Sequence, residues 1–202
     1  MSLTAETTAL LVLDLQNEIV EPRGKRYPHL KGQLKRRKTV ENAGQAVRLA
    51  RRHGVEVIYV TVGWRAGYPE LGATPQMTTI RELGGFEEDG WGAAVSEAVA
   101  PAAGEILVRK RSVSALNGTE LPRYLTLKGI RTVVLIGVAT NWAVEGTARD
   151  AADLGYRVVV LEDCCASFSD EMHKFSCSQI LPVLGSVWTS AEFEEALAGR
   201  KL

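Results

Sequence analysis

The length, composition and charge of this 202-residue chain exclude several classes of protein. The length fits one domain of ordinary size, well above the range in which disulfides or metals must hold a small core together. Hydrophobic residues make up 46% and charged residues 24% of the chain, which is an average globular composition and excludes a disordered or fibrous protein. The 24 basic and 24 acidic side chains balance, so neither nucleic acid nor an acidic membrane is favoured as the main partner.

The apolar runs and the cysteines indicate a cytoplasmic protein. Runs such as 9–13 and 132–138 are much shorter than the ~20 residues of a membrane-spanning helix. The N-terminal sequence leads straight into an apolar run, without the charged region and cleavage site of a secretory signal. Cys164, Cys165 and Cys177 are an odd number without metal-ligand spacing, so we expect reduced thiols.

Strand and helix signals alternate along the whole chain. Strands are predicted at 9–14, 55–62, 105–108, 132–138, 157–161 and, weakly, 186–188. Helices are predicted at 38–53, 121–128, 142–154, 170–181 and 191–198. Several strands are apolar on both faces, as strands between two helix layers are. The alternation predicts one α/β domain over residues 1–202, with a mostly parallel sheet covered on both faces.

Two segments, 18–37 and 63–92, do not fit this alternation and are interpreted as long loops. The first is rich in Arg, Lys, Pro and Gly, and the second contains several glycines and two tryptophans. Both follow predicted strands, and ligands bind beyond the carboxyl ends of strands in open parallel sheets. The two segments are therefore either the walls of a pocket or variable surface loops.

Asp14 and Lys110 each end a predicted strand and are candidates for acid–base chemistry. Burial at the sheet edge favours the neutral acid and would raise the pKa of Asp14 towards a useful range. Each residue alone has an ordinary alternative, a cap for Asp14 and a solvated strand end for Lys110. Together they are more informative, because each charge makes burial of the other tolerable.

A third feature is the segment 137–151, in which a strand ends in glycine and a helix opens at about Trp142. Free backbone N–H groups at such a helix start can stabilise a developing oxyanion. The alternative is an ordinary strand-to-helix turn with Thr140 or Asn141 as the N-cap.

These motifs, in this order, resemble those of the isochorismatase-like hydrolase superfamily, also called the cysteine hydrolases. The resemblance covers nearly the whole chain. Its first motif, LLVLDLQNEI, carries Asp14, Gln16 and Asn17. The second, KRSVSALNGTEL, carries Lys110, Ser114, Gly118, Thr119 and Leu121, and the third is GVATNWAVEGTARDAADLGYRVVVLEDCCAS.

The resemblance implies a three-layer α/β/α, Rossmann-like fold with a six-stranded parallel sheet. It further implies that Asp14 and Lys110 form the catalytic acid–base pair. A cis peptide at Val138–Ala139 would present the N–H of Ala139, beside that of residue 143, as an oxyanion hole.

The chain departs from the superfamily at the nucleophile. The pattern T-x-x-C-V is here Thr140-Asn141-Trp142-Ala143-Val144, so the cysteine position holds Ala143. A methyl group cannot attack a carbonyl, so covalent catalysis through this position is impossible. One explanation is the branch of the family that lacks the nucleophile, and another is an amidohydrolase whose cysteine at 143 has been mutated to alanine. A third is a non-catalytic binding protein on the same fold.

In the branch that lacks the nucleophile, the resemblance implies hydrolysis of a vinyl ether by a cofactor-free enzyme. Protonated Asp14 would deliver its proton to a terminal alkene carbon, Lys110 would stabilise charge, and water would complete the cleavage. Nicotinamidases of the superfamily bind zinc through histidines in an arrangement that His29, His53 and His173 do not reproduce. We therefore expect no metal, with His29 in a loop and His53 at a helix end.

The pocket walls are predicted from position and from residue type. Gln16, Trp64, Arg65 and Trp142 are candidate substrate-binding residues, because an arginine can bind a carboxylate and an aromatic ring can cover an unsaturated group. The tryptophan-bearing loops could instead lie at a subunit interface. The expected partners are a small-molecule substrate and further copies of this chain, in a homodimer or homotetramer.

Overall fold

The computed structural model describes residues 3–199, which form a six-stranded parallel sheet in the order β3-β2-β1-β4-β5-β6. The strands are β1 (Thr8–Leu13), β2 (Glu56–Val62), β3 (Ile106–Lys110), β4 (Thr132–Val138), β5 (Arg157–Ala166) and β6 (Ser186–Trp188). The predicted α/β sheet is therefore confirmed. The strand boundaries lie within two residues of the prediction, and those of β4 and β6 match it, except that β5 continues to Ala166.

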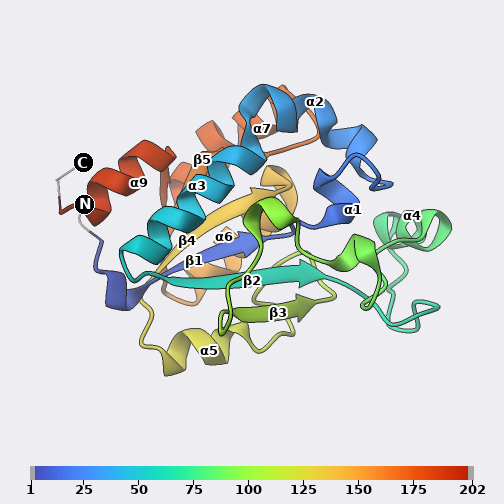
Figure 1. Ribbon diagram of the computed structural model, residues 1–202, viewed down its shortest axis with the longest axis horizontal. Helices are drawn as coiled ribbons and strands as arrows, with labels where there is room; N and C mark the ends of the chain where they lie inside the picture. Colours follow the sequence, from blue (N-terminus) through green and yellow to red (C-terminus); the bar gives the residue numbers. More distant parts are fainter. Residues whose placement is uncertain (1–2, 200–202) are drawn as a thin grey trace.

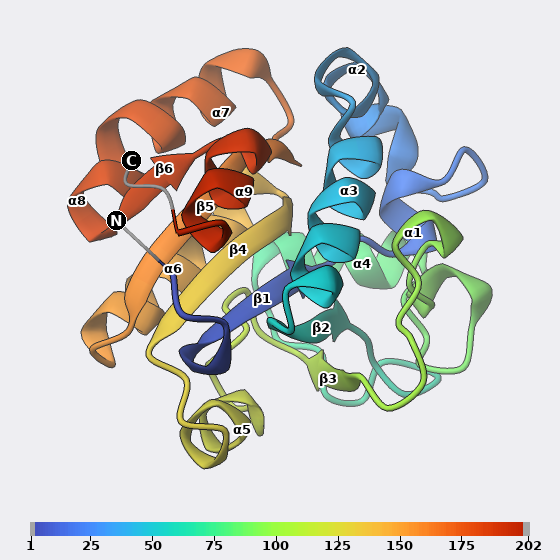
Figure 2. The same cartoon turned by 60° about the vertical axis from the view of Figure 1, so that its left-hand side comes forward.

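Helices cover both faces of this sheet (Figures 1 and 2). They are α1 (Asn17–Val20), α2 (Tyr27–Arg37), α3 (Thr39–Arg52), α4 (Pro75–Leu83), α5 (Leu121–Leu127), α6 (Glu145–Asp153), α7 (Asp170–Phe175), α8 (Leu181–Leu184) and α9 (Ser190–Leu197). The α2, α3 and α9 helices pack with Leu10 and Val12 on one face. The α5, α6 and α8 helices pack with Leu11 and Leu13 on the other. Alternate residues of β1 thus enter opposite cores, as the pleat of a strand requires.

The interpretation of 18–37 and 63–92 as loops is wrong in part, because each segment contains a helix. In α2, Leu30 and Leu34 are buried four residues apart on one face, and Pro28 lies in the first turn, where its missing N–H costs nothing. Lys38 ends the helix at φ 52°, with its N–H on the carbonyl of Leu34. In α4, the hydroxyl of Thr74 accepts from the N–H of Met77 as an N-cap. The basic and polar composition of both segments concealed these short helices.

The carboxyl ends of the strands face one side of the molecule. Figure 1 shows β2 and β3 pointing towards the side where α1 and α4 lie. Residues 3–199 contain no helix with both the length and the apolar character that crossing a membrane demands.

Candidate active site

A cavity of about 270 Å³ opens at the carboxyl ends of β1 to β4. This volume suits a small metabolite rather than a large ligand. Asp14, Lys110, Ala139 and Ala143 come from the strand ends and the turn after β4, whereas the segments after β1 and β2 supply most of the remaining wall. The prediction that these two segments could build a pocket therefore agrees with the structure, although both are partly helical.

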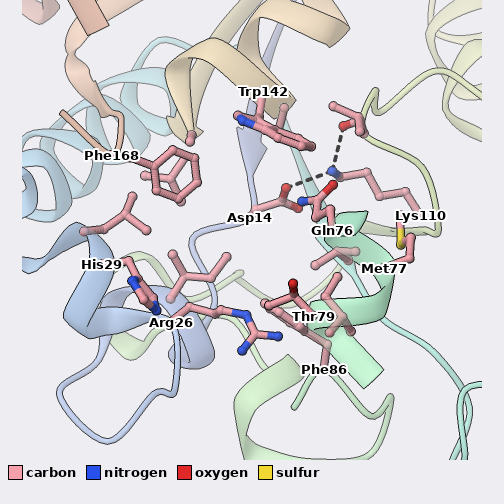
Figure 3. Close-up of a pocket in the computed structure, with 18 of the residues that line it drawn as sticks. Asp14, Arg26, His29, Gln76, Met77, Thr79, Phe86, Lys110, Trp142 and Phe168 are labelled. Carbon is pink, nitrogen blue, oxygen red and sulfur yellow. Dashed lines mark hydrogen bonds and ion pairs between the residues drawn. The ribbon is translucent and has the colours of Figure 1, made fainter. Parts of the chain in front are cut away.

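Asp14 and Lys110 meet in this cavity (Figure 3). Their side chains are 8% and 2% exposed, and Lys110 Nζ lies 2.8 Å from Asp14 Oδ2. Asp14 follows β1 directly and has φ 53°, in the left-handed region that a residue with a side chain adopts at a cost. Backbone bonds hold it there, since its N–H donates to Val60 O and its carbonyl accepts from the N–H of Gln16.

The hydrogen bonds of this pair are distributed unequally. Lys110 Nζ donates to Val113 O at 2.8 Å and to Ser112 O at 3.3 Å besides its bond to Asp14, so its three N–H groups are all occupied. Asp14 Oδ1 is buried and has no partner among residues 3–199. Burial raises the pKa of Asp14 above its usual range, and the charge of Lys110 opposes this without reversing it. Asp14 is thus the member of the pair with a free atom and an increased affinity for a proton.

The turn after β4 forms the wall beside this pair. The Val138–Ala139 peptide is cis, as the resemblance implied, and Ala139, Trp142 and Ala143 line the cavity. Thr140–Val144 form a wide helical turn that continues into α6. Just before it, Gly137 pairs with Leu13, and a Cβ there would lie 1.9 Å from Leu13 O. Only glycine lets β1 and β4 approach so closely beneath the site.

Two of the four residues predicted to bind substrate, Trp64 and Trp142, line the cavity. Gln16 lies elsewhere: its side-chain amide donates to Val62 O and Ala93 O, and its oxygen accepts from the N–H of Val62. It joins the end of β1 to the end of β2 and is fully buried. Arg65 is also outside the cavity wall, and its exposed side chain pairs with Glu70.

The structure brings further polar residues to the cavity that the sequence did not single out. Arg26 and His29 come from the start of α2, and Gln76 comes from α4. Gln76 lines the same cavity as the Asp14–Lys110 pair, and all three residues are labelled in Figure 3. A helix prediction for 27–37 would have placed Arg26 and His29 one turn apart, and that was the signal available in the sequence.

The three histidines occupy different environments. His29 lies in α2 rather than in a loop, and His53 follows the end of α3, as predicted. His173 is fully buried, its Nδ1 lies 2.8 Å from the hydroxyl of Thr140, and burial lowers its pKa to about 4. Outside the cavity, His173 forms a group with Glu162 and Cys177 that has the donor atoms to hold a metal ion. Within the described residues, no such group lines the cavity.

The three cysteines are buried and free, and none lines the cavity. Burial raises the pKa of Cys164 and Cys165, and it raises that of Cys177 to about 12. A thiol is an effective nucleophile only as the thiolate. None of these cysteines is therefore placed to replace the missing nucleophile at position 143.

A family model for the isochorismatase domain matches residues 8–192. The chain belongs to the isochorismatase family. It is 35% identical to the isochorismatase family protein YecD of Escherichia coli O157:H7, over 98% of this chain and 100% of that protein. It is 34% identical to the ureidoacrylate amidohydrolase RutB of Acinetobacter baylyi, over 96% of this chain and 84% of that protein.

Solved structures of the isochorismatase family share this fold. The N-carbamoylsarcosine amidase of Thermoplasma acidophilum is 31% identical with a TM-score of 0.73, over 91% of this chain and 96% of that one. An isochorismatase family protein of Burkholderia thailandensis is 29% identical with a TM-score of 0.78, over 98% of both chains. This chain is thus a hydrolase of the isochorismatase family with the α/β fold of these structures.

Proposed function

We propose that this protein is a cofactor-free hydrolase that cleaves a small unsaturated or carboxylate/amide metabolite without a cysteine nucleophile. Asp14 and Lys110 serve as its acid–base pair. The observation that carries this proposal is the Asp14 carboxyl group. It is buried, has a raised pKa and an unpaired Oδ1, and lines a cavity whose nucleophile position is a methyl group. A free acid beside an inert wall favours protonation of the substrate over covalent catalysis.

The reaction best suited to this site is hydrolysis of a vinyl ether. The proton on Asp14 passes to the terminal carbon of the C=C–O unit, and the alkene electrons form the new C–H bond. Water adds to the resulting oxocarbenium carbon and returns one proton to Asp14. Collapse of the hemiketal breaks the C–O bond and gives a ketone and an alcohol. No oxidant, reductant or cofactor enters this balance.

Lys110 acts in this scheme through charge rather than by direct contact. Its three N–H groups are occupied by Asp14, Val113 and Ser112, so none is free for the substrate. Its positive charge stabilises the Asp14 carboxylate that remains after the proton has left. Asp14 therefore loses and regains one proton in each cycle, while Lys110 keeps its three hydrogen bonds.

Amide hydrolysis is a second candidate function, favoured by the relatives and by the position of Ala143. The relatives include a ureidoacrylate amidohydrolase and an N-carbamoylsarcosine amidase. Ala143 is 3% exposed and lines the cavity together with Ala139 and Lys110. A cysteine there would stand beside the acid–base pair, where covalent attack on a carbonyl needs it.

A substrate screen with matched variants separates these functions. The protein and its Ala143→Cys and Ala143→Gly variants are assayed on vinyl ethers, carbamoyl compounds and small amides. The proposal predicts vinyl ether hydrolysis by the protein and by Ala143→Gly, because neither residue takes part in bond making. Amide hydrolysis that only Ala143→Cys performs would instead support the amidohydrolase, and inactivity of all three would favour a binding protein.

A further inference from the structure

Arg26 is a cationic group of the cavity wall that the proposed chemistry does not use. It is the residue before α2, and its backbone N–H donates to Glu18 O at 3.0 Å. Figure 3 shows Arg26, with His29, Thr79 and Phe86, on one side of the cavity, and Asp14, Lys110 and Trp142 on the other. The cavity thus has a charged group at each of two opposite walls.

The guanidinium of Arg26 lacks hydrogen-bonding partners. Nη1 and Nη2 are both buried, and no acceptor within residues 3–199 bonds to them. The guanidinium carbon lies 5.7 Å from the ring centre of Phe86. A ring face attracts a cation, but it does not satisfy planar N–H donors. Buried donors of a charged group are normally paired, so this arrangement is incomplete without an acceptor.

The neighbouring charged and titratable groups do not supply this acceptor. Glu18 acts on Arg26 through its charge, but its Oε1 accepts from the N–H of Lys25 at 2.8 Å, and no ion pair joins it to Arg26. Gly85 encloses the Glu18 carboxylate, since a Cβ there would lie within 3 Å of its oxygens. The hydroxyl of Tyr68 is bonded to Gly85 O at 2.8 Å. Glu18 Oε1 and the hydroxyl of Tyr68 are therefore each held by another partner.

We propose that Arg26 binds a carboxylate of the substrate through its two terminal nitrogens. A carboxylate accepts two parallel N–H bonds from a guanidinium, which fixes its orientation as well as its position. The wall between the two ends is largely apolar and includes Met77, Ile80 and Phe168. The ligand is therefore an apolar monocarboxylate, and, on the basis of the proposed function, its reacting bond lies at the end next to Asp14.

Binding of benzoate and benzamide tests this site without any requirement for turnover. The two probes have the same ring and similar shape, and only benzoate is charged. Isothermal titration calorimetry of the unmodified protein is expected to show at least tenfold tighter binding of benzoate. Arg26→Gln should weaken benzoate binding by about 10- to 100-fold, the range for a lost charged hydrogen bond, and leave benzamide binding unchanged. Arg23→Gln is the matched control, because Arg23 lies on the same segment but stacks on Trp91 outside the cavity.

Two results would overturn the proposal. If Arg26→Gln retains the preference for benzoate over benzamide, the anion binds at Lys110 instead. If the unmodified protein has no such preference, the cavity has no carboxylate site. Should Arg26→Gln fail to fold by circular dichroism, Arg26→Lys replaces it. A lysine cannot make the paired bonds, so the preference should fall at least threefold, and an unchanged preference would overturn the proposal. The preference is measured without hydrolysis, so its loss in Arg26→Gln supports this site even if no substrate is ever cleaved.

Discussion

Replacement of Lys110 by methionine removes the cation from the buried pair but keeps a long apolar side chain. Asp14 then loses its only ion-pair partner within residues 3–199, and its second oxygen becomes unpaired. The carbonyls of Ser112 and Val113 lose a donor at the same time. Breaking a buried pair by removing one partner costs about 3–5 kcal/mol, so we expect the free energy of unfolding to fall by this amount near pH 8.

The loss should shrink at lower pH, because Asp14 can take up a proton. Burial already raises the pKa of Asp14 in the folded protein, and without Lys110 it rises further above the value of about 3.9 in the unfolded chain. A carboxyl group whose pKa is higher in the folded protein than in the unfolded chain stabilises the folded protein at low pH. This stabilisation is complete below the pKa of the unfolded chain and is lost as the pH rises through the pKa of the folded protein. The free energy of unfolding changes through this group by at most about 1.4 kcal/mol per pH unit.

Urea unfolding of Lys110→Met at pH 5.5 and pH 8 measures both effects. Lys128→Met is the matched control, because Lys128 pairs with Glu56 at 3.0 Å on the surface, with side chains 40% and 29% exposed. That variant should lose no more than about 1 kcal/mol at either pH. Two results would contradict the effect of burial on the Asp14–Lys110 pair. One is an equal loss of unfolding free energy in both variants, and the other is a loss for Lys110→Met that does not change with pH.

Three further predictions concern the wall beside the pair. A cysteine at position 143 should titrate below the ~8.5 of a free thiol, because Lys110 and the start of a helix both favour the thiolate. The rate of alkylation by iodoacetamide as a function of pH measures this pKa, with the buried Cys164, Cys165 and Cys177 as internal controls. A midpoint at or above the free-thiol value would contradict the prediction. Prolonged dialysis against a chelator should leave hydrolysis unchanged, since no group of candidate metal ligands among residues 3–199 lines the cavity. A loss of activity that added zinc restores would contradict this prediction. Gly137→Ala should lower the melting temperature by about 10 °C or prevent folding, because its Cβ would overlap Leu13 O. Gly32→Ala, whose Cβ would meet nothing within 4 Å, should not, and equal melting temperatures for the two variants would contradict the close approach of β1 and β4.

The sheet and the acid–base pair were predictable from the sequence for a physical reason. Strands buried on both faces are continuous apolar runs, and a charged residue at the end of such a run stands out. Asp14 ends such a run, whereas Lys110 ends the shorter and partly exposed edge strand β3. The register of the parallel strands brings the ends of both strands to one edge of the sheet. The cis peptide and the special position of 143 came from the family resemblance and not from any local pattern.

The rest of the cavity was predicted less well from the sequence. Arg65 follows a strand as Asp14 does, yet Glu70 on the surface binds its side chain. Gln16 has the polar amide of a substrate-binding residue, but the backbone of β2 and Ala93 uses all of it. Arg26 enters the cavity because α2 folds where the composition indicated a loop. The contacts of Gln16 join segments that are distant in the sequence, whereas Arg65 binds Glu70 only five residues further along the chain.

The most direct test of the proposed mechanism is the turnover of Asp14→Asn on whichever vinyl ether the screen identifies. The amide keeps the shape of the side chain and can still accept a bond from Lys110, but it cannot deliver a proton. We expect kcat to fall by about 10²- to 10⁴-fold, the usual contribution of a general acid, with the variant folded by circular dichroism. An Asp14→Asn protein that turns over within twofold of the unmodified enzyme would contradict the role of Asp14 as the acid.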